Sequence, residues 1–164
     1  MSDLQAILDS AALADDAIEL RLIRILEVGD LSKREPATAF LALAPEYRFA
    51  IHRRDDGRRV GRIHVRITDH PDIVPVLGHM GCAVEEEYRR KGYATRAIRL
   101  LSALAGQLGM AEIWVLIEPD NIPSRRTVER AGFRLVDEVD TMPPALALGL
   151  GARVCRYAMS TQAA

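Results

Sequence analysis

The chain has 164 residues, of which 49% are hydrophobic and 27% are charged, as expected of a globular protein with a sizeable core. Its 22 lysines and arginines are balanced by 23 acidic residues, which gives no support to nucleic-acid binding. No apolar run approaches the roughly 20 residues that cross a bilayer, so we expect no membrane partner and a single domain over residues 1–164.

The N-terminal segment and the cysteines predict a cytoplasmic protein. Acidic residues stand near the N-terminus, where a secretion signal would carry basic ones. Cys82 and Cys155 lie far apart and do not have the spacing of a metal site. We therefore expect reduced thiols and no bound metal.

The first half of the chain predicts one helix followed by antiparallel strands. Apolar residues at helical spacing predict an N-terminal helix within residues 1–17. Apolar and β-branched runs predict strands at residues 20–28, 47–52 and 60–67, and residues 36–45 favour a helical turn. An Asp-Asp-Gly sequence between the last two strands indicates a hairpin, and the polar residues that alternate along the second of them indicate one wet face.

The centre of the chain alternates strands and helices. Residues 76–84 predict a strand that contains Gly78 and Gly81, and such glycines often mark a bulge or a close approach by a ligand. Apolar residues at helical spacing predict a helix over residues 92–108. The unbroken apolar run at residues 113–117 is typical of a central strand.

The C-terminal part predicts one more helix and two strands. Asn121 is placed to cap a helix that ends at residue 131. Residues 133–136 and 153–158 predict the final strands, and residues 142–151 predict the loop between them. The order of elements indicates an α/β protein.

A basic turn that contains one glycine opens the helix over residues 92–108. Arg89, Arg90 and Lys91 supply full positive charges, and Gly92 lets an anion approach the main chain closely. The first N–H groups of a helix lack internal partners, and the helix dipole adds partial positive charge there. The turn is too short for a Walker motif and lacks the three glycines of a dinucleotide fingerprint. We therefore interpret it as a pyrophosphate site.

Three motifs in order resemble the GNAT superfamily of acyl-CoA-dependent N-acyltransferases. Arg89-x-x-Gly92-x-Ala94 is similar to the pyrophosphate turn of that family. Asn121-x-x-Ser124, followed by Ala131-Gly132-Phe133, is similar to its second block. The resemblance covers residues 61–157, and it looks nearest to the GHIGY-type predicted acetyltransferases and less close to the ribosomal-protein N-terminal acetyltransferases.

The resemblance implies a twisted, mixed α/β sheet of six to seven strands with flanking helices. Two central strands, at residues 76–84 and 113–117, would splay apart, and the pantetheine arm of acetyl-CoA would enter between them. Arg125 or Arg126 would reach the adenosine phosphate. The cofactor-binding residues that the resemblance implies are Cys82, Ala83, Val84, Arg89, Arg90, Lys91, Gly92, Tyr93, Ala94, Thr95, Asn121 and Ser124.

The resemblance also implies transfer of the acetyl group to a primary amine by direct attack in a ternary complex. A backbone N–H near Ala83 or Val84 would polarise the thioester carbonyl. Val128 stands where many members of the family have a tyrosine acid. Ser124 is therefore the candidate donor to the leaving thiolate, with helix capping as its alternative role.

His79 and Glu118 are the candidate bases. His79 has a suitable unperturbed pKa of ~6.5, and a hydrogen-bonded structural role is its alternative. Glu118 would act through water, with loop bracing as its alternative. Cys82 would instead allow an acyl-enzyme, although a buried, apolar role is favoured for a cysteine on a strand.

Two other functions stay open at this point. A family member that has lost its catalytic activity would act as an acyl-CoA-binding module. Alternatively, an arginine-rich hairpin would suit the binding of a nucleotide or a nucleic acid. The hairpin arginines would otherwise select an anionic acceptor or, as we favour, form a solvated edge that prevents strand pairing. The sequence does not identify the amine, and a homodimer is frequent in similar families. The arginines concerned are Arg53, Arg54, Arg58, Arg59, Arg62 and Arg66.

Overall fold

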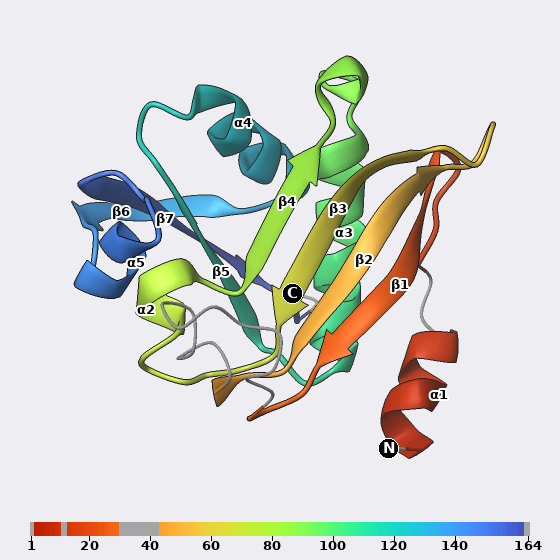
Figure 1. Ribbon diagram of the computed structural model, residues 1–164, viewed down its shortest axis with the longest axis horizontal. Coiled ribbons are helices and arrows are strands. Elements are labelled where there is room, and N and C mark those ends of the chain that lie inside the picture. Colours follow the sequence, from red (N-terminus) through yellow and green to blue (C-terminus); the bar gives the residue numbers. More distant parts are fainter. Residues whose placement is uncertain (1, 11–12, 30–42, 163–164) are drawn as a thin grey trace.

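The computed structural model describes residues 2–10, 13–29 and 43–162, which form an α/β structure with two antiparallel sheets. One sheet has the strand order β1-β2-β3-β4, and the other has the order β5-β7-β6 (Figure 1). The predicted α/β class is confirmed. The two central strands that were expected to splay apart are β4 and β5, and they belong to different sheets.

The first sheet is built from strands that are neighbours in sequence. β1 (Ile18–Leu26) pairs with β2 (Glu46–Arg53), and β2 pairs with β3 (Arg59–Arg66) as the predicted hairpin. β4 (Met80–Val84) completes the sheet beside β3. A helix, α1 (Ser2–Ser10), precedes β1 and ends earlier than the predicted helix.

One helix covers one face of this sheet. α3 (Tyr93–Gln107) lies behind the first sheet in Figure 1, and its apolar residues form the predicted buried stripe. Alternate strand residues such as Phe49 and Ile63 belong to the same core. The residues between them face the opposite side, where Figure 1 shows no described helix over β1, β2 and β3. The buried apolar residues of α3 are Ala97, Ile98, Leu101, Leu104 and Ala105.

The second sheet places β7 (Arg153–Ser160) between β5 (Glu112–Ile117) and β6 (Arg134–Asp140). α4 (Ile122–Ala131) connects β5 to β6. Asn121 caps this helix as predicted, because its short polar side chain can accept a hydrogen bond from the first turn.

The strand predicted at residues 76–84 begins later than expected. Its first residues belong instead to α2 (Val74–Leu77), and Pro75 favours this helix because its fixed φ suits a first turn. Gly78 then takes a φ of +66°, and a Cβ there would lie 2.6 Å from the Trp114 carbonyl oxygen. The close approach at this glycine is therefore made by the backbone of β5 and not by a ligand.

The connection between β6 and β7 also differs from expectation. Residues 142–151, predicted as a loop, contain the short helix α5 (Pro143–Ala147), which begins at two prolines. The helical turn predicted at residues 36–45 lies largely outside the described residues. In the part of the chain that is described, no helix is long and apolar enough to cross a membrane.

Candidate active site

β4 and β5 meet at one point and then diverge. A bridge joins Gly78 to Val115. Beside it, the His79 N–H donates to the Trp114 carbonyl oxygen at 2.7 Å, and Nδ1 of His79 accepts from the Trp114 N–H at 2.8 Å. Beyond this junction the two strands separate in Figure 1, and the outer edge of β4 has no strand partner among the described residues. The strand pair is splayed, as the resemblance implies.

The hydrogen-bond register of β4 decides which of its amides face the gap. The backbone of His79 and that of Glu85, on either side of β4, are bonded to β3 at 2.7 and 2.9 Å. Because bonded positions alternate along an antiparallel pair, Ala83 also faces β3, whereas the N–H groups of Cys82 and Val84 face the gap. Of the two amides expected to polarise a carbonyl, only that of Val84 is free to do so.

The turn between β4 and α3 presents a run of unpaired N–H groups. Arg90 and Gly92 have positive φ values of 60° and 81°, which coil the main chain ahead of the helix. The Arg96 N–H bonds to the Gly92 carbonyl oxygen at 3.1 Å, but no N–H of residues 90–95 has an acceptor within the described chain. A Cβ at Gly92 would meet nothing within 4 Å. The turn therefore has both the donors and the room for a phosphate.

Side chains fix this turn to its surroundings. Nε of Arg89 donates to the Val84 carbonyl oxygen at 3.0 Å and ties the turn to the end of β4. Nζ of Lys91 lies 5.5 Å from the centre of the Tyr88 ring, and the Arg53 guanidinium of the hairpin lies 5.7 Å from the same centre. Because each cation–π contact contributes about 0.5–1 kcal/mol at an exposed site, Tyr88 links the turn to the hairpin.

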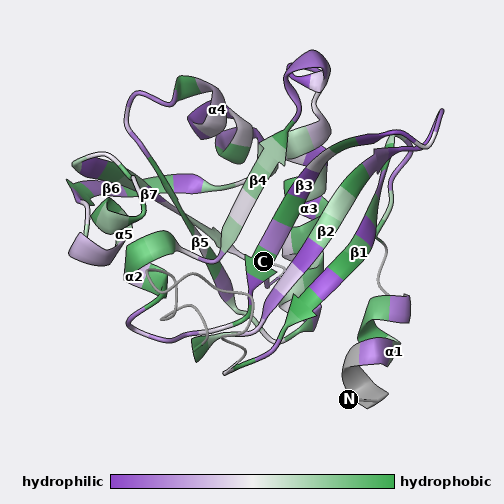
Figure 2. Cartoon of the chain, viewed as in Figure 1, coloured by the Kyte–Doolittle hydropathy of each residue, from purple (hydrophilic) through white to green (hydrophobic). Residues whose placement is uncertain are grey.

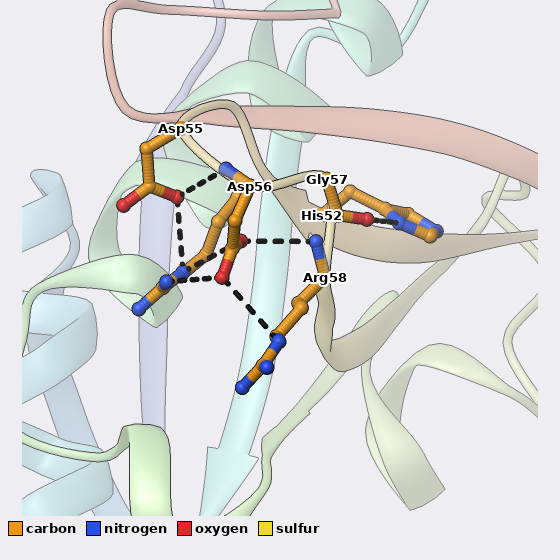
Figure 3. Close-up of polar contacts among 6 residues, drawn as sticks. His52, Asp55, Asp56, Gly57 and Arg58 are labelled. Carbon is orange, nitrogen blue, oxygen red and sulfur yellow. Dashed lines mark hydrogen bonds and ion pairs between the residues drawn. The ribbon is translucent and has the colours of Figure 1, made fainter.

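Two acidic residues of the hairpin turn pair with Arg53 and Arg58 (Figure 3). Asp55 lies 3.1 Å from Nε of Arg53, and Asp56 pairs with Arg53 and lies 3.5 Å from Nε of Arg58. The hydrogen bond from Arg53 lowers the pKa of Asp56 to about 2. The turn is charged and exposed, but the predicted edge is wrong, because β2 and β3 both lie inside the first sheet and Arg66 is buried beside Glu46.

A groove of about 600 Å³ begins at Gly92 and follows the exposed side of α3. Arg96, Arg99 and Arg130 are among its lining residues. Arg96 is paired with Asp15 at 2.8 Å, whereas Arg99 and Arg130 make no ion pair with any described residue. The sequence analysis missed these cations. Arg96 and Arg99 follow Gly92 at helical spacing, which was the available signal, but nothing in the sequence places Arg130 beside them.

Arg125, one candidate for the adenosine phosphate, points into the protein instead. Its Nε lies 2.8 Å from the Tyr157 hydroxyl, and its NH1 donates to the Pro119 carbonyl oxygen at 2.9 Å. The Tyr157 hydroxyl in turn donates to Glu129 at 2.9 Å. The other candidate, Arg126, is exposed.

Asn121 and Ser124 have separate roles at the start of α4. Oδ1 of Asn121 accepts a hydrogen bond from the Ser124 N–H at 3.3 Å. No described group bonds to Oγ of Ser124, so the capping role considered for its hydroxyl belongs to Asn121. The Ser124 hydroxyl is half-buried and free to donate.

Both candidate bases have structural partners. His79 is 2% exposed, and its Nε2 lies 2.8 Å from the Thr68 carbonyl oxygen while its Nδ1 accepts from Trp114. Burial lowers the pKa of His79, so the ring is neutral at pH 7 and both of its nitrogens are engaged. Glu118 accepts from the Gly151 N–H at 2.8 Å and braces the loop before β7. The geometry favours the structural alternative for His79 and the loop-bracing alternative for Glu118.

The remaining nucleophile candidate is a protonated thiol. Burial raises the pKa of Cys82 to about 12, and a thiol is a far weaker nucleophile than a thiolate. This chemistry disfavours an acyl-cysteine. Within the described ranges, no group of three or more His, Cys, Asp or Glu side chains is placed to hold a metal ion.

The chain is similar in structure to several solved acetyltransferases. One is a Vibrio cholerae protein assigned as a ribosomal-protein-serine acetyltransferase (TM-score 0.62, 14% identity, 90% of this chain and 96% of that one). Another is the ribosomal-protein-S5-alanine acetyltransferase of Vibrio fischeri (TM-score 0.61, 16% identity, 90% and 95%). A third is Mycobacterium smegmatis RimJ, solved with CoA-disulfide (TM-score 0.56, 20% identity, 76% and 56%). At these identities the likeness shows a shared fold.

A family model also matches the sequence itself. The model is described as an acetyltransferase (GNAT) domain and covers residues 3–134. No curated protein matches the chain. The matched range includes the pyrophosphate-like turn and the block that begins at Asn121, and it reaches further toward the N-terminus than the motifs do. The chain therefore belongs to the GNAT family of acetyltransferase domains.

Proposed function

We propose that this acyltransferase moves an acetyl group from acetyl-CoA to a primary amine by direct attack in a ternary complex. One observation carries the proposal, namely that the free edge of β4 leads directly into the unpaired amides of residues 90–95. A pantetheine arm can add to such an edge as an extra strand does, while its pyrophosphate reaches the turn. RimJ, which has a similar fold, was solved with a CoA derivative.

The contacts to acetyl-CoA divide between main chain and side chains. Main-chain groups on the free edge of β4, among them the Cys82 N–H, pair with the pantetheine arm, and the N–H groups of residues 90–95 hold the pyrophosphate. Charge from the basic turn strengthens these hydrogen bonds. The groove beyond Gly92 receives the nucleotide end of the molecule, where Arg99 and Arg130 offer unpaired cations.

The reaction needs one donor for the carbonyl oxygen and one for the leaving sulfur. The amine nitrogen bonds to the thioester carbon, and the carbon–sulfur bond breaks with its electron pair left on the sulfur. The Val84 N–H stabilises the developing oxyanion, because its dipole is fixed before the reaction begins. The Ser124 hydroxyl donates to the thiolate, which ends as the free thiol of CoA after it takes up the proton that the amine loses.

The base acts without His79, because that ring has no free nitrogen. An alkylamine with a pKa of ~10.4 is mostly protonated at pH 7, so only its small neutral fraction can attack the thioester. Glu118 keeps one carboxylate oxygen free of hydrogen bonds to described residues, and it can accept the proton through water.

Calorimetric titration with acetyl-CoA tests the first half of the proposal. We expect micromolar binding by the native chain and a loss on the order of tenfold or more in Gly92→Asp, because the new carboxylate repels the pyrophosphate. Gly57→Asp is the matched control, since Gly57 also has a positive φ and open space around its Cα. Equal weakening by both variants, or no binding by the native chain, would contradict the proposal.

Release of CoA thiol in the presence of amines tests the second half. Binding of acetyl-CoA without release of thiol on any amine would instead identify an acyl-CoA-binding module. Three further expectations from the sequence stay predictions, namely the single domain, the cytoplasmic location and the homodimer. Limited proteolysis, cell fractionation and light scattering check them in turn.

A further inference from the structure

Three arginines from three neighbouring strands meet on the sheet face opposite α3. Arg24 of β1 lies directly across from Arg48 of β2, and Arg62 of β3 is diagonal to Arg48. Figure 2 shows hydrophilic residues interspersed with hydrophobic ones along β1, β2 and β3. The three side chains line a pocket of about 290 Å³, with Ile23, Phe49 and Ile63 as its other lining residues.

Among the described residues, the positive charge at this pocket exceeds the negative charge around it. Glu46 lies 2.6 Å from Nε of Arg48, but the same carboxylate also serves Arg66 at 2.9 Å. Arg24 and Arg62 make no ion pair with any residue in the described ranges. Because like charges directly opposite each other destabilise a strand pair, an anion bound between these guanidinium groups would offset a repulsion that the described chain leaves uncompensated.

The pocket lies close to the strand that we assign to the thioester. Arg62 is the register partner of Ala83 on β4, so its side chain leaves the sheet on the same face as that of Ala83. Adjacent strands are about 4.8 Å apart, which places Arg48 roughly 10 Å and Arg24 roughly 15 Å from β4. Because the carbonyl lies on the far edge of β4, an anion held by all three arginines would be on the order of 10–15 Å from it.

We propose that this pocket binds an anionic group of the acceptor, a carboxylate or a phosphate carried about 10–15 Å from the amine that is acetylated. The inference rests on the proposed function for the position of the amine. It narrows the acceptor to molecules with one primary amine and one remote anion. Arginine suits this role because its planar fork can donate two parallel hydrogen bonds to either group.

Three short peptides serve as probes, because an extended chain places the third side chain about 10 Å from the N-terminal amine. Their sequences are Ala-Ala-Glu-Ala, Ala-Ala-Gln-Ala and Ala-Ala-phosphoserine-Ala. Transfer is measured as kcat/KM for each peptide, and binding is measured separately by titration without acetyl-CoA. The variants are Arg24→Gln and Arg62→Gln, which break no described ion pair. Arg59→Gln, on the exposed end of β3, is the control with the same change in charge.

We expect the two anionic peptides to exceed the glutamine peptide by on the order of tenfold in kcat/KM. Arg24→Gln and Arg62→Gln should bring that ratio toward one, whereas Arg59→Gln should leave it unchanged. A higher kcat/KM for one of the two anionic peptides then shows whether the pocket prefers a carboxylate or a phosphate. Equal rates for all three peptides, or a ratio that survives both variants, would overturn the inference while leaving the acetyltransferase reaction intact.

The binding measurement separates this inference from the proposed function. If no peptide is acetylated, tighter binding of the anionic peptides that Arg62→Gln abolishes would keep the anion site and reject transfer to these peptides. Equal binding of all three peptides would reject the anion site whatever happens to acetyl-CoA.

Discussion

His79 and Trp114 are joined by two reciprocal hydrogen bonds at the point where β4 and β5 meet. The His79 N–H donates to the Trp114 carbonyl oxygen at 2.7 Å, and Nδ1 of His79 accepts from the Trp114 N–H at 2.8 Å. Gly78 next to them completes the junction, because β5 passes too close for any larger residue. This pair sets the apex of the gap between the strands, so the shape of the proposed cofactor site depends on it.

Replacement of His79 should therefore unfold the junction before it affects chemistry. His79→Ala removes an acceptor and leaves the buried Trp114 N–H unpaired, which we expect to cost about 2–4 kcal/mol in the free energy of unfolding. Urea titration followed by fluorescence measures this cost, since Trp114 is the chain's one tryptophan. His52→Ala, at the half-buried end of β2, is the control, since its Nδ1 lies 3.0 Å from the carbonyl oxygen of Gly57 in the exposed turn. Equal stability of the two variants would contradict the structural role.

The stability of the fold should fall between about pH 6.5 and pH 4 because of two histidines, the buried His79 and the half-buried His64. Burial lowers the pKa of His79, and burial followed by the charge of Arg66 lowers the pKa of His64 to about 4. An unfolded histidine has a pKa of ~6.5, so below that value the unfolded chain binds more protons than the folded chain. Their contribution is complete above pH ~6.5 and is lost as the pH falls, by up to about 1.4 kcal/mol per pH unit for each ring.

Urea unfolding at about pH 7.5, 6 and 5 checks this dependence. His64→Gln should reduce the slope, because it removes one of the two titrating rings. A free energy of unfolding that is constant over this range would show that the histidines are not held neutral.

Gly78→Ala should be more costly than the same change at Gly57. Both glycines have a positive φ, of 66° and 70°, so both variants carry the strain of a left-handed alanine, about 1 kcal/mol. A Cβ at Gly78 would also lie 2.6 Å from the Trp114 carbonyl oxygen, whereas a Cβ at Gly57 would meet nothing within 4 Å. We expect a further loss of about 1–3 kcal/mol at Gly78 alone. Thermal unfolding of both variants measures this loss. Equal shifts of the unfolding temperature would mean that β5 lies further from Gly78.

Local rules predicted much of this fold from the sequence. The apolar stripe of α3, the Asp-Asp-Gly hairpin and the cap at Asn121 depend on residues close together in the chain, and all three are present. The strand expected from residue 76 failed because Pro75 and Gly78 favour a short helix and its end over an apolar run. The periodicity of apolar residues alone does not reveal this competition between a short helix and a strand.

The candidate site was less predictable, because it depends on contacts between distant segments. Spacing indicated the phosphate turn, but the choice of Val84 over Ala83 as carbonyl donor needs the register of β4 against β3. In the same way, the pairing of His79 with Trp114 and the convergence of Arg99 with Arg130 join residues that no local pattern connects.

Loss of the Cys82 side chain should leave acetyl transfer intact. Burial raises the pKa of this thiol to about 12, so at pH 7 the thiolate that an acyl-enzyme requires is nearly absent. We expect Cys82→Ala to keep kcat within about threefold of the native value, and we expect no acetylated protein after incubation with acetyl-CoA alone. Intact-mass spectrometry checks the second point. A mass increase of one acetyl group on Cys82 would establish the ping-pong route instead.

Substitution of Ser124 and of Asn121 should separate catalysis from capping at the start of α4. Asn121→Ala removes the hydrogen bond to the Ser124 N–H and should cost about 1 kcal/mol in stability. Ser124→Ala removes a hydroxyl with no described partner, so stability should change by less than about 0.5 kcal/mol. If that hydroxyl donates to the leaving thiolate, kcat should fall on the order of tenfold or more while KM for acetyl-CoA stays nearly constant. Thermal unfolding and steady-state release of CoA thiol, measured on both variants, decide the matter. An unchanged kcat in Ser124→Ala would mean that water protonates the thiolate and that this hydroxyl has no part in the chemistry.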